Sequence, residues 1–165
     1  MTEPARQPIR VLCVDDHACF IDALRALIEA AADFVRVGAE CCGEDAIDAA
    51  RRLRPDFVLM DVRMPGIGGL RAARTLLEQH PRMLVVLMSA EPELLPADAA
   101  RSGRLQCVIK ERLTAAALTR LWRAHEQELL AKNDPVAEGL GDEVRPRAGV
   151  DLGHRVADVG SDRVM

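Results

Sequence analysis

Hydrophobic residues gather in five short runs along this chain, and polar or amphipathic segments separate the runs. The first run, Ile9 to Val14, is continuous and rich in β-branched residues, as in a strand buried on both faces. Phe34 to Glu40 alternates more, which indicates an edge strand. Phe57 to Asp61, Met83 to Ser89 and Cys107 to Lys110 complete the set. Strand and helix patterns that alternate in this way predict an α/β fold, with a parallel sheet covered by helices on both faces.

Helix-like segments follow four of these runs. Their apolar residues recur at helical spacing, so we expect one face of each helix to pack on the sheet. The apolar stripes are Phe20, Leu24, Leu27 and Ile28; Ala46, Ala50 and Leu53; Leu70, Ala73 and Leu77; and Leu118, Leu121 and Trp122, which Leu129 and Leu130 could extend. Thr114 precedes the last stripe, and its hydroxyl is suited to cap that helix.

The segment after the fourth run differs from the others because it contains two prolines. Pro92 is acceptable in the first turn of a helix. Pro96 in a helix interior would remove a hydrogen bond and cost roughly 3 kcal/mol. We therefore expect a short, shifted or kinked helix between the fourth and fifth strands.

Length and composition allow one hydrophobic core. The chain has 165 residues, of which 49% are hydrophobic, and a net charge of -4. We expect a domain over residues 8–126 and a polar, disordered tail over residues 127–165, where apolar residues are too sparse to build a core. The pI of about 5.6 argues against a basic surface for DNA or RNA, so no direct nucleic-acid partner is expected.

The cysteines and the N-terminus indicate the compartment. Five cysteines, an odd number without C-x-x-C spacing, fall mostly inside apolar runs, where a thiol behaves as a small hydrophobe. This usage is typical of a reducing cytosol. Residues 1–8 are polar and no long apolar stretch follows them, so neither a secretory signal nor a membrane span is predicted. We expect a soluble, cytoplasmic protein.

Polar residues with complementary chemistry stand where four of the five runs end. Asp15 and Asp16 follow the first run, Asp61 and Ser89 end the third and fourth, and Lys110 ends the fifth. In an open α/β sheet the ligand crevice lies outside the carboxyl ends of the strands, so these side chains are expected to meet. Three carboxylates, one hydroxyl and one ammonium suit a Mg²⁺ ion together with a phosphoryl group.

Each of these residues also has an ordinary structural explanation. Asp16 and Ser89 are common helix caps, and Asp61 could be a turn residue before a Pro-Gly loop. An isolated lysine such as Lys110 is usually a solvated surface residue. Separate caps have no reason to recur in this joint arrangement, so the functional interpretation is favoured. His17 is more often a surface residue than a ligand. His80, His125 and His154 are interpreted as incidental.

These residues occur in motifs that resemble a known family. V-D-D-H at Val14 to His17, D-V-R-M-P-G at Asp61 to Gly66, Ser89-Ala90 and Lys110 are similar to the receiver domain of two-component response regulators, over roughly residues 8 to 125. The resemblance implies a flavodoxin-like five-stranded sheet with strand order 2-1-3-4-5. The first motif is most similar to the branch that normally carries a helix-turn-helix output, and we do not expect such an output here.

The resemblance also implies a metal site and a phosphoacceptor. Asp61 would accept a phosphoryl group from the phosphohistidine of a histidine kinase or phosphotransfer protein, or from a small acyl phosphate. Asp16 and Asp61 would ligate Mg²⁺ directly, Asp15 would do so through water, and the backbone carbonyl of Arg63 would complete the set. Without metal, three adjacent carboxylates repel each other, so at least one pKa should rise and Mg²⁺ should stabilise the fold.

Other residues would hold the phosphoryl group and set its lifetime. Lys110 would pair with one phosphoryl oxygen, and the Ser89 hydroxyl would donate to another, drawing the fourth loop inward. Ala90, Arg63 and Glu91 lie at positions that modulate the reaction in the family. A salt bridge between Arg63 and Glu91 would shield the acyl phosphate from water, and this remains a hypothesis to test.

The sequence departs from the family pattern at the switch position. Members usually carry tyrosine or phenylalanine where this chain has Cys107, and the chain contains no tyrosine at all. A cysteine is too small to swing between buried and exposed positions, so Cys107 and Pro96 together put the usual output face in doubt. Glu111 replaces a common proline, and Gly68 stands where the loop often has aspartate.

We therefore expect a stand-alone receiver that, once phosphorylated, switches a protein effector or pairs with a second copy of itself. It would catalyse only its own phosphorylation and dephosphorylation. Two alternatives stay open: an interaction module that works without phosphorylation, and a truncated transcriptional regulator that lacks its DNA-binding domain. A phosphatase with an Asp-x-Asp motif is disfavoured because Arg63 occupies the place of the second acid.

Overall fold

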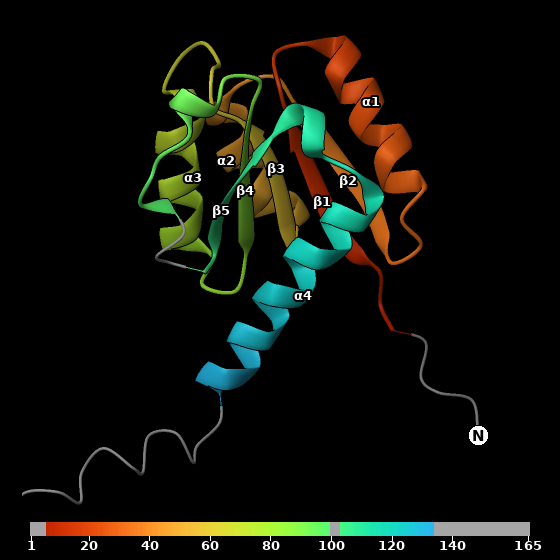
Figure 1. Cartoon of the computed structure of the whole chain (residues 1–165). Coiled ribbons are helices and arrows are strands. Elements are labelled where there is room, and N and C mark those ends of the chain that lie inside the picture. Colours follow the sequence, from red (N-terminus) through yellow and green to blue (C-terminus); the bar gives the residue numbers. More distant parts are fainter. Residues whose placement is uncertain (1–5, 100–102, 134–165) are drawn as a thin grey trace, which may run out of the picture. The chain divides into compact units, whose positions relative to one another are not determined.

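Five parallel strands form a single sheet in the order β2-β1-β3-β4-β5 (Figure 1). A computed structural model describes residues 6–99 and 103–133, so most of the predicted tail lies outside the described residues. The strands are β1 (Ile9–Val14), β2 (Phe34–Glu40), β3 (Phe57–Asp61), β4 (Leu84–Ser89) and β5 (Leu105–Ile109). This order confirms the flavodoxin-like arrangement that the sequence predicts.

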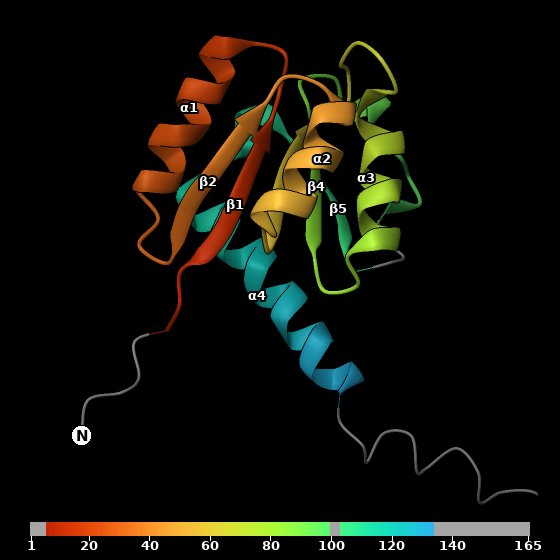
Figure 2. The same cartoon turned by 180° about the vertical axis from the view of Figure 1, so that it is seen from behind.

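Helices cover both faces of the sheet. They are α1 (Ala18–Glu29), α2 (Gly43–Leu53), α3 (Gly68–Gln79) and α4 (Ala115–Lys132). Helices α1 and α4 lie over one face, and α2 and α3 lie over the opposite face, which Figure 2 shows from behind. A sheet covered on both sides needs strands that are apolar at every position. Strands β3 and β4 meet this need, because all their residues are buried.

Alternate residues of each strand enter two separate cores. On the α2 and α3 side, the sheet contributes Leu12, Val14, Val58, Met60, Val85 and Leu87. On the α1 and α4 side, it contributes Val11, Cys13, Phe57, Leu59, Leu84, Val86 and Met88. The small side chains of Ala46, Ala49 and Ala50 allow α2 to lie close to the sheet. Because helices cover both faces of the sheet, the ends of the strands remain available for a ligand site.

Helix ends follow the local sequence. The hydroxyl of Thr114 accepts a hydrogen bond of 3.1 Å from the backbone N–H of Ala117, which confirms the predicted cap of α4. Helix α2 ends at Leu53, and its C-cap residue is Arg54, whose φ of 46° is left-handed. Pro55 follows directly and cannot donate a helical hydrogen bond.

The connection from β4 to β5 contains no α-helix within the described residues 90–99 and 103–104. A 3-10 turn spans Pro92–Leu94, with Pro92 at its start. Leu95 then adopts an extended conformation, with ψ of 130°, as the residue before a proline usually does. Pro96 therefore ends this turn. The described part of the connection contains no α-helix, where the sequence predicted a short, shifted or kinked one.

Helix α4 continues past residue 126, where the sequence placed the end of the domain, and runs to Lys132. His125 on this helix is fully buried, and its Nε2 lies 2.9 Å from the carbonyl oxygen of Arg82. Its ring lies 5.4 Å from that of Trp122, centre to centre. His125 therefore belongs to the packing of α4, a structural role that the sequence did not predict. Within the described segments, no helix is long and apolar enough to cross a membrane.

Candidate functional site at the carboxyl edge of the sheet

Strand pairing brings the predicted site residues to one edge of the sheet. The register pairs Val14 with Met60, Asp61 with Met88, and Ser89 with Ile109. Asp15 follows β1, Asp61 and Ser89 end β3 and β4, and Lys110 follows β5. Three of these four side chains, those of Asp15, Asp61 and Ser89, are almost completely buried. These three side chains therefore face the interior at the sheet edge and are not exposed to solvent.

Lys110 links two of the carboxylates directly. Its Nζ lies 2.5 Å from Oδ2 of Asp15 and 2.9 Å from Oδ1 of Asp61. The ammonium also lies 4.1 Å from the ring centre of Phe20, on α1. The sequence predicted Phe20 only as part of the apolar stripe of α1. Helical spacing identifies a residue that packs on the sheet, but it does not show that the same ring also contacts a lysine. The side chain of Lys110 is only 14% exposed, so it is not a solvated surface lysine.

The two charged partners shift each other's pKa. Burial alone lowers the pKa of Lys110, but its hydrogen bonds and attraction to Asp15 and Asp61 outweigh burial and raise that pKa. Burial is also the largest effect on Asp61 and raises its pKa, while Lys110 opposes the rise and the charges of Asp15 and Asp16 add to it. The predicted rise in a carboxyl pKa is thus present at Asp61, but burial causes more of it than repulsion does.

Asp15 and Asp16 occupy different environments at the start of α1. Asp15 is buried and accepts a hydrogen bond of 2.9 Å from the backbone N–H of His17. Asp16 is exposed and lies 2.9 Å from Nδ1 of His17. His17 itself is the residue that precedes α1, and no side-chain hydrogen bond caps the helix. The explanation of Asp16 as a helix cap is therefore wrong.

The acidic residues provide a donor set that fits a hard cation. Asp15, Asp16 and His17 each offer a ligand atom, and these atoms lie within 4.8 Å of one another. Carboxylate oxygens are the ligands that Mg²⁺ prefers, whereas a ring nitrogen suits softer ions. An ammonium already lies between the carboxylates of Asp15 and Asp61, so these two oxygens can hold a positive charge.

Ser89 and the residues after it form the loop on the other side of Asp61. The hydroxyl oxygen of Ser89 accepts a hydrogen bond of 3.0 Å from the backbone N–H of Glu91. A hydroxyl that accepts one bond can still donate its proton to another group. The guanidinium of Arg63 lies 2.9 Å from Oε1 of Glu91, so the predicted salt bridge is present. Ala90 lies between Ser89 and Glu91 and is exposed.

The backbone around Asp61 depends on Gly69, in the first turn of α3. A Cβ atom on Gly69 would lie 1.9 Å from the carbonyl oxygen of Asp61, so α3 begins in direct contact with the site strand. The amide of Gly69 also donates a hydrogen bond of 3.0 Å to the carbonyl of Val62. Glu44 on α2 fixes the same loop, because its carboxylate accepts a bond of 3.0 Å from the amide of Ile67. Periodicity alone could not reveal this close approach.

The cysteines fall into two groups. Cys13 is buried in the sheet, as predicted, and burial raises its pKa to about 12. Cys107 is partly buried against the core beneath α2 and α3, at the position of the family's aromatic switch residue. Cys19 and Cys41 are exposed, so the prediction that the cysteines behave as small hydrophobes is wrong for these two.

Comparison with known proteins matches the described fold and motifs. The family model "Response regulator receiver domain" matches residues 11–121. The chain is 42% identical to the response regulator GacA of Pseudomonas aeruginosa over 96 residues, which are 58% of this chain and 45% of that protein. It is 38% identical to the response regulator UvrY of Escherichia coli over 96 residues, or 44% of that protein. The matched segment thus spans less than half the length of these relatives.

Solved structures agree on the architecture. A two-component response regulator of the LuxR family from an Aurantimonas species has a TM-score of 0.61 and 25% identity, with 69% of this chain and 81% of that chain covered. The signal receiver domain of NarL from Mycobacterium tuberculosis has a TM-score of 0.64 and 24% identity, with 73% and 98% covered. The second likeness shows the fold alone.

Proposed function

This chain belongs to the family of response regulator receiver domains, and from that premise we propose that Asp61 is its phosphoacceptor. Asp61 ends the central strand β3 and is the carboxylate that Lys110 contacts at 2.9 Å. Its side chain is almost fully buried, so it has a fixed position from which to attack. This position of Asp61, beside the lysine that also contacts Asp15, is the observation that carries the proposal.

The phosphoryl donor would be a histidine kinase, a phosphotransfer protein or a small acyl phosphate. A carboxylate oxygen of Asp61 forms a bond to phosphorus while the bond from phosphorus to the donor nitrogen or oxygen breaks. The imidazole or carboxylate of the donor then leaves, and Asp61 carries an acyl phosphate. Phosphoryl transfer needs positioning and charge neutralisation more than covalent help. The protein would catalyse no reaction other than its own phosphorylation and the hydrolysis that reverses it.

Mg²⁺ is the proposed cofactor, and it would neutralise the phosphoryl oxygens when bound. Asp15, Asp16 and Asp61 would supply carboxylate oxygens, and the backbone carbonyl of Arg63 would complete the set. Burial disfavours the ionised form of Asp61 and raises its pKa. A nearby cation favours the carboxylate that must act as the nucleophile. The donor set therefore supports the assignment of these four ligands.

The lysine and the serine would respond to the new phosphoryl group. Lys110 would exchange its contact with Asp61 for a charge-assisted hydrogen bond to a phosphoryl oxygen. Ser89 would donate its hydroxyl proton to a second oxygen, and the loop that begins at Glu91 would follow because its amide binds the same hydroxyl. The structural change would therefore appear first between β4 and β5.

We propose that a protein partner detects this change. The described part of the connection from β4 to β5 contains turns and no α-helix, so the surface it offers differs from one built on an α-helix. Cys107 replaces the usual aromatic residue, which favours a route through the loop backbone over a side-chain rotation. The same two observations favour the second candidate, an interaction module that works without phosphorylation.

Intact mass spectrometry tests the main proposal. The full chain is incubated with Mg²⁺ and acetyl phosphate, beside an Asp61→Asn variant and a sample with excess chelator. We expect one phosphoryl adduct in the first sample, and no adduct in the variant or with chelator. No adduct in the unaltered chain, together with an unfolding temperature that Mg²⁺ does not change, would contradict the proposal and favour the phosphorylation-independent module.

A further inference from the structure

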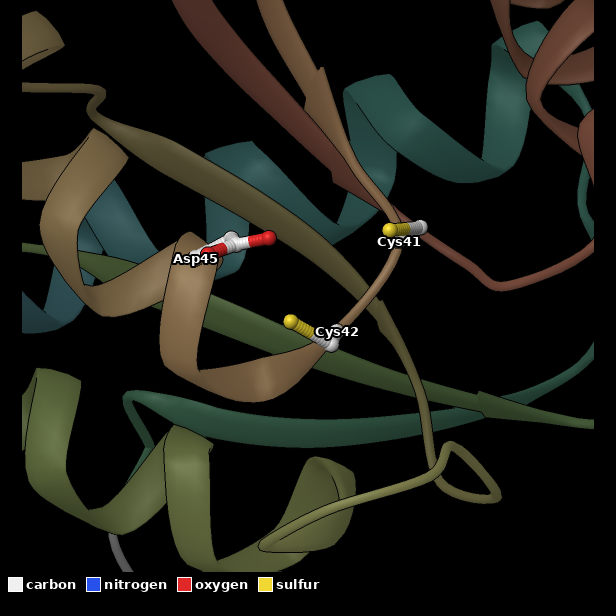
Figure 3. A group of neighbouring side chains, drawn as sticks. All are labelled: Cys41, Cys42 and Asp45. Atoms are coloured by element: carbon white, nitrogen blue, oxygen red, sulfur yellow. The ribbon is translucent and has the colours of Figure 1, made fainter.

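Two adjacent thiols and a carboxylate converge outside the acidic site, at the start of α2. Cys41 follows β2, Cys42 immediately precedes α2, and Asp45 lies in the first turn of that helix. One ligand atom from each residue lies within 4.8 Å of the other two. Figure 3 shows both sulfur atoms and the carboxylate pointing toward a common space. We infer that these three side chains bind a thiophilic divalent metal ion, with Zn²⁺ as its natural class.

The arrangement is close to what a tetrahedral ion requires. Zinc binds sulfur at about 2.3 Å and carboxylate oxygen at about 2.0–2.2 Å, so tetrahedral ligand atoms lie roughly 3.5–3.8 Å apart. The ligand atoms of the three residues lie at most 4.8 Å apart, and small side-chain rotations would shorten these distances to the tetrahedral range. Cys41 and Asp45 are exposed and Cys42 is partly so, which leaves these rotations unhindered and a fourth position for water.

The backbone holds these ligands in place. The carbonyl of Cys42 accepts a hydrogen bond of 3.1 Å from the amide of Ala46, which fixes the first turn of α2. Gly43 lies between the thiols and that turn, and a Cβ atom there would lie 2.8 Å from the Cβ of Ala72 on α3. The helix is thus anchored to its neighbour, so a metal ion would bind without ordering a loose segment.

The donor set favours one class of metal ion. Two thiolates attract soft and borderline ions, and Mg²⁺ binds thiolates poorly. A thiol must lose its proton to bind a metal ion as thiolate, so metal uptake should release protons. One carboxylate beside two sulfurs suits Zn²⁺ better than Cu⁺, which prefers sulfur alone.

The cluster is distinct from the acidic site but close to it. A hollow of about 350 Å³ is lined by Cys41 and by both Asp15 and Asp16. The backbone amide of Asp15 donates a hydrogen bond of 3.1 Å to the carbonyl of Glu40, the residue before Cys41. An experiment must therefore distinguish a metal ion bound by the thiolates from one bound only by the carboxylates of the acidic site.

Cobalt provides that separation, because only thiolate ligands give Co²⁺ an intense charge-transfer absorption in the near ultraviolet. The reduced, metal-free full chain is titrated with Co²⁺ in excess Mg²⁺, which occupies the acidic site, and then with Zn²⁺. We expect the band to saturate at one equivalent of Co²⁺, with the visible absorption of tetrahedral coordination, and to disappear as Zn²⁺ displaces it. Absence of the band in the reduced chain would overturn the inference.

Matched variants assign the ligands. Cys41→Ser and Cys42→Ser should each abolish the sulfur band, and Asp45→Asn should weaken Co²⁺ binding at least tenfold. Cys19→Ser, which removes an exposed thiol elsewhere, and Asp48→Asn, one turn further along α2, should change neither the band nor the affinity. Circular dichroism checks that each variant is folded. A band that survives in a folded Cys41→Ser variant, or that Cys19→Ser removes, would contradict the assignment.

Discussion

The guanidinium of Arg63 lies 2.9 Å from Oε1 of Glu91, and this ion pair joins the loop after β3 to the loop after β4. Both side chains are more than half exposed, at 68% and 58%. An exposed pair of this kind contributes roughly 0–1 kcal/mol to folding. Its position beside Asp61 and Ser89 makes control of water at the site a better explanation for it than stability.

Arg63→Ala should therefore increase the rate at which phosphorylated Asp61 is hydrolysed while leaving the free energy of unfolding within about 0.5 kcal/mol of the original. Removing the pair opens the path by which water reaches the acyl phosphate. Loss of the phosphoryl adduct is followed over time by intact mass, and stability is followed by urea denaturation. Glu91→Gln should give the same acceleration, and the double variant should add nothing further. An unchanged hydrolysis rate in Arg63→Ala would rule out the shielding role.

Lys110→Met should destabilise the metal-free protein strongly. The substitution keeps an unbranched side chain one atom shorter but leaves Asp15 and Asp61 without their shared cation, and loss of one partner from a buried ion pair typically costs about 3 kcal/mol. Urea denaturation in chelator measures the loss. Lys132→Met, which alters the exposed partner of Glu128, should change stability by less than about 0.5 kcal/mol. Equal effects from the two lysines would show that Lys110 has no special electrostatic role.

Asp61→Asn should raise the unfolding temperature at pH 7.5 in chelator, even though it removes the proposed phosphoacceptor. Because burial raises the pKa of Asp61 in the folded state, this carboxyl adds stability below its ordinary pKa of 3.8 and loses that contribution as the pH rises through the folded value. At neutral pH the ionised group therefore opposes folding, and asparagine removes the charge.

Added Mg²⁺ should make the original chain more stable than Asp61→Asn, the reverse of their order in chelator. The original chain should gain about 2.7 kcal/mol at a Mg²⁺ concentration one hundred times the dissociation constant, while Asp61→Asn should gain less. Differential scanning fluorimetry in chelator and in Mg²⁺ measures the unfolding temperatures of both proteins. Asp48→Asn, on the exposed side of α2, controls for loss of any carboxylate and should respond to Mg²⁺ as the original does. A Mg²⁺ response that is the same in Asp61→Asn would remove Asp61 from the ligand set.

The fold was predictable because its signals are local. Continuous apolar runs such as Phe57 to Asp61 have no stable place except a strand buried on both faces, and β3 is buried at every position. The candidate site followed from the same pattern, since parallel strands place their carboxyl ends at one edge. Asp15, Asp61 and Ser89 could be grouped on that basis alone, and the structure brings them there.

The remaining features depend on contacts that no repeat pattern encodes. The prediction that Lys110 pairs with an attached phosphoryl oxygen stays a prediction. The sequence did not show that, without that group, Lys110 lies between Asp15 and Asp61, where two buried carboxylates need a cation. The contact of Phe20 with Lys110 and the convergence of Cys41 with Asp45 arise where separate elements meet. Sequence spacing shows which residues share a strand or helix, and it does not show which side chains of different elements approach each other.

Gly69→Ala should disrupt the site from the backbone. A Cβ atom at this position would lie 1.9 Å from the carbonyl oxygen of Asp61, and neither backbone segment can yield without moving β3 or α3. We expect a loss of about 3 kcal/mol or more, and slower phosphorylation by acetyl phosphate if the variant folds. Gly68→Ala is the matched control, because it meets only the strain of its φ of 73°, about 1–2 kcal/mol. A smaller loss at residue 69 than at residue 68 would contradict the proposed contact.

His125 should make the stability of the protein depend on pH. Burial lowers the pKa of this histidine below its ordinary value of 6.5, so the unfolded chain binds the proton first as the pH falls. Stability from this group is therefore complete above about pH 6.5, falls as the pH drops below that value, and levels off below the folded pKa. In His125→Gln the amide can still donate to the carbonyl of Arg82, but the group no longer titrates.

The difference in unfolding free energy between the original chain and His125→Gln isolates this effect. Burial, and further Arg51 and Arg54, lower the pKa of His80, so His80 also makes stability depend on pH. This contribution is the same in both proteins and cancels in the difference. Urea denaturation between about pH 5 and pH 8 should show the advantage of the original chain shrinking as the pH falls below 6.5. A difference that stays constant over this range would mean that His125 takes up its proton equally well in the folded and unfolded chains, and the buried neutral ring would then not be what anchors α4.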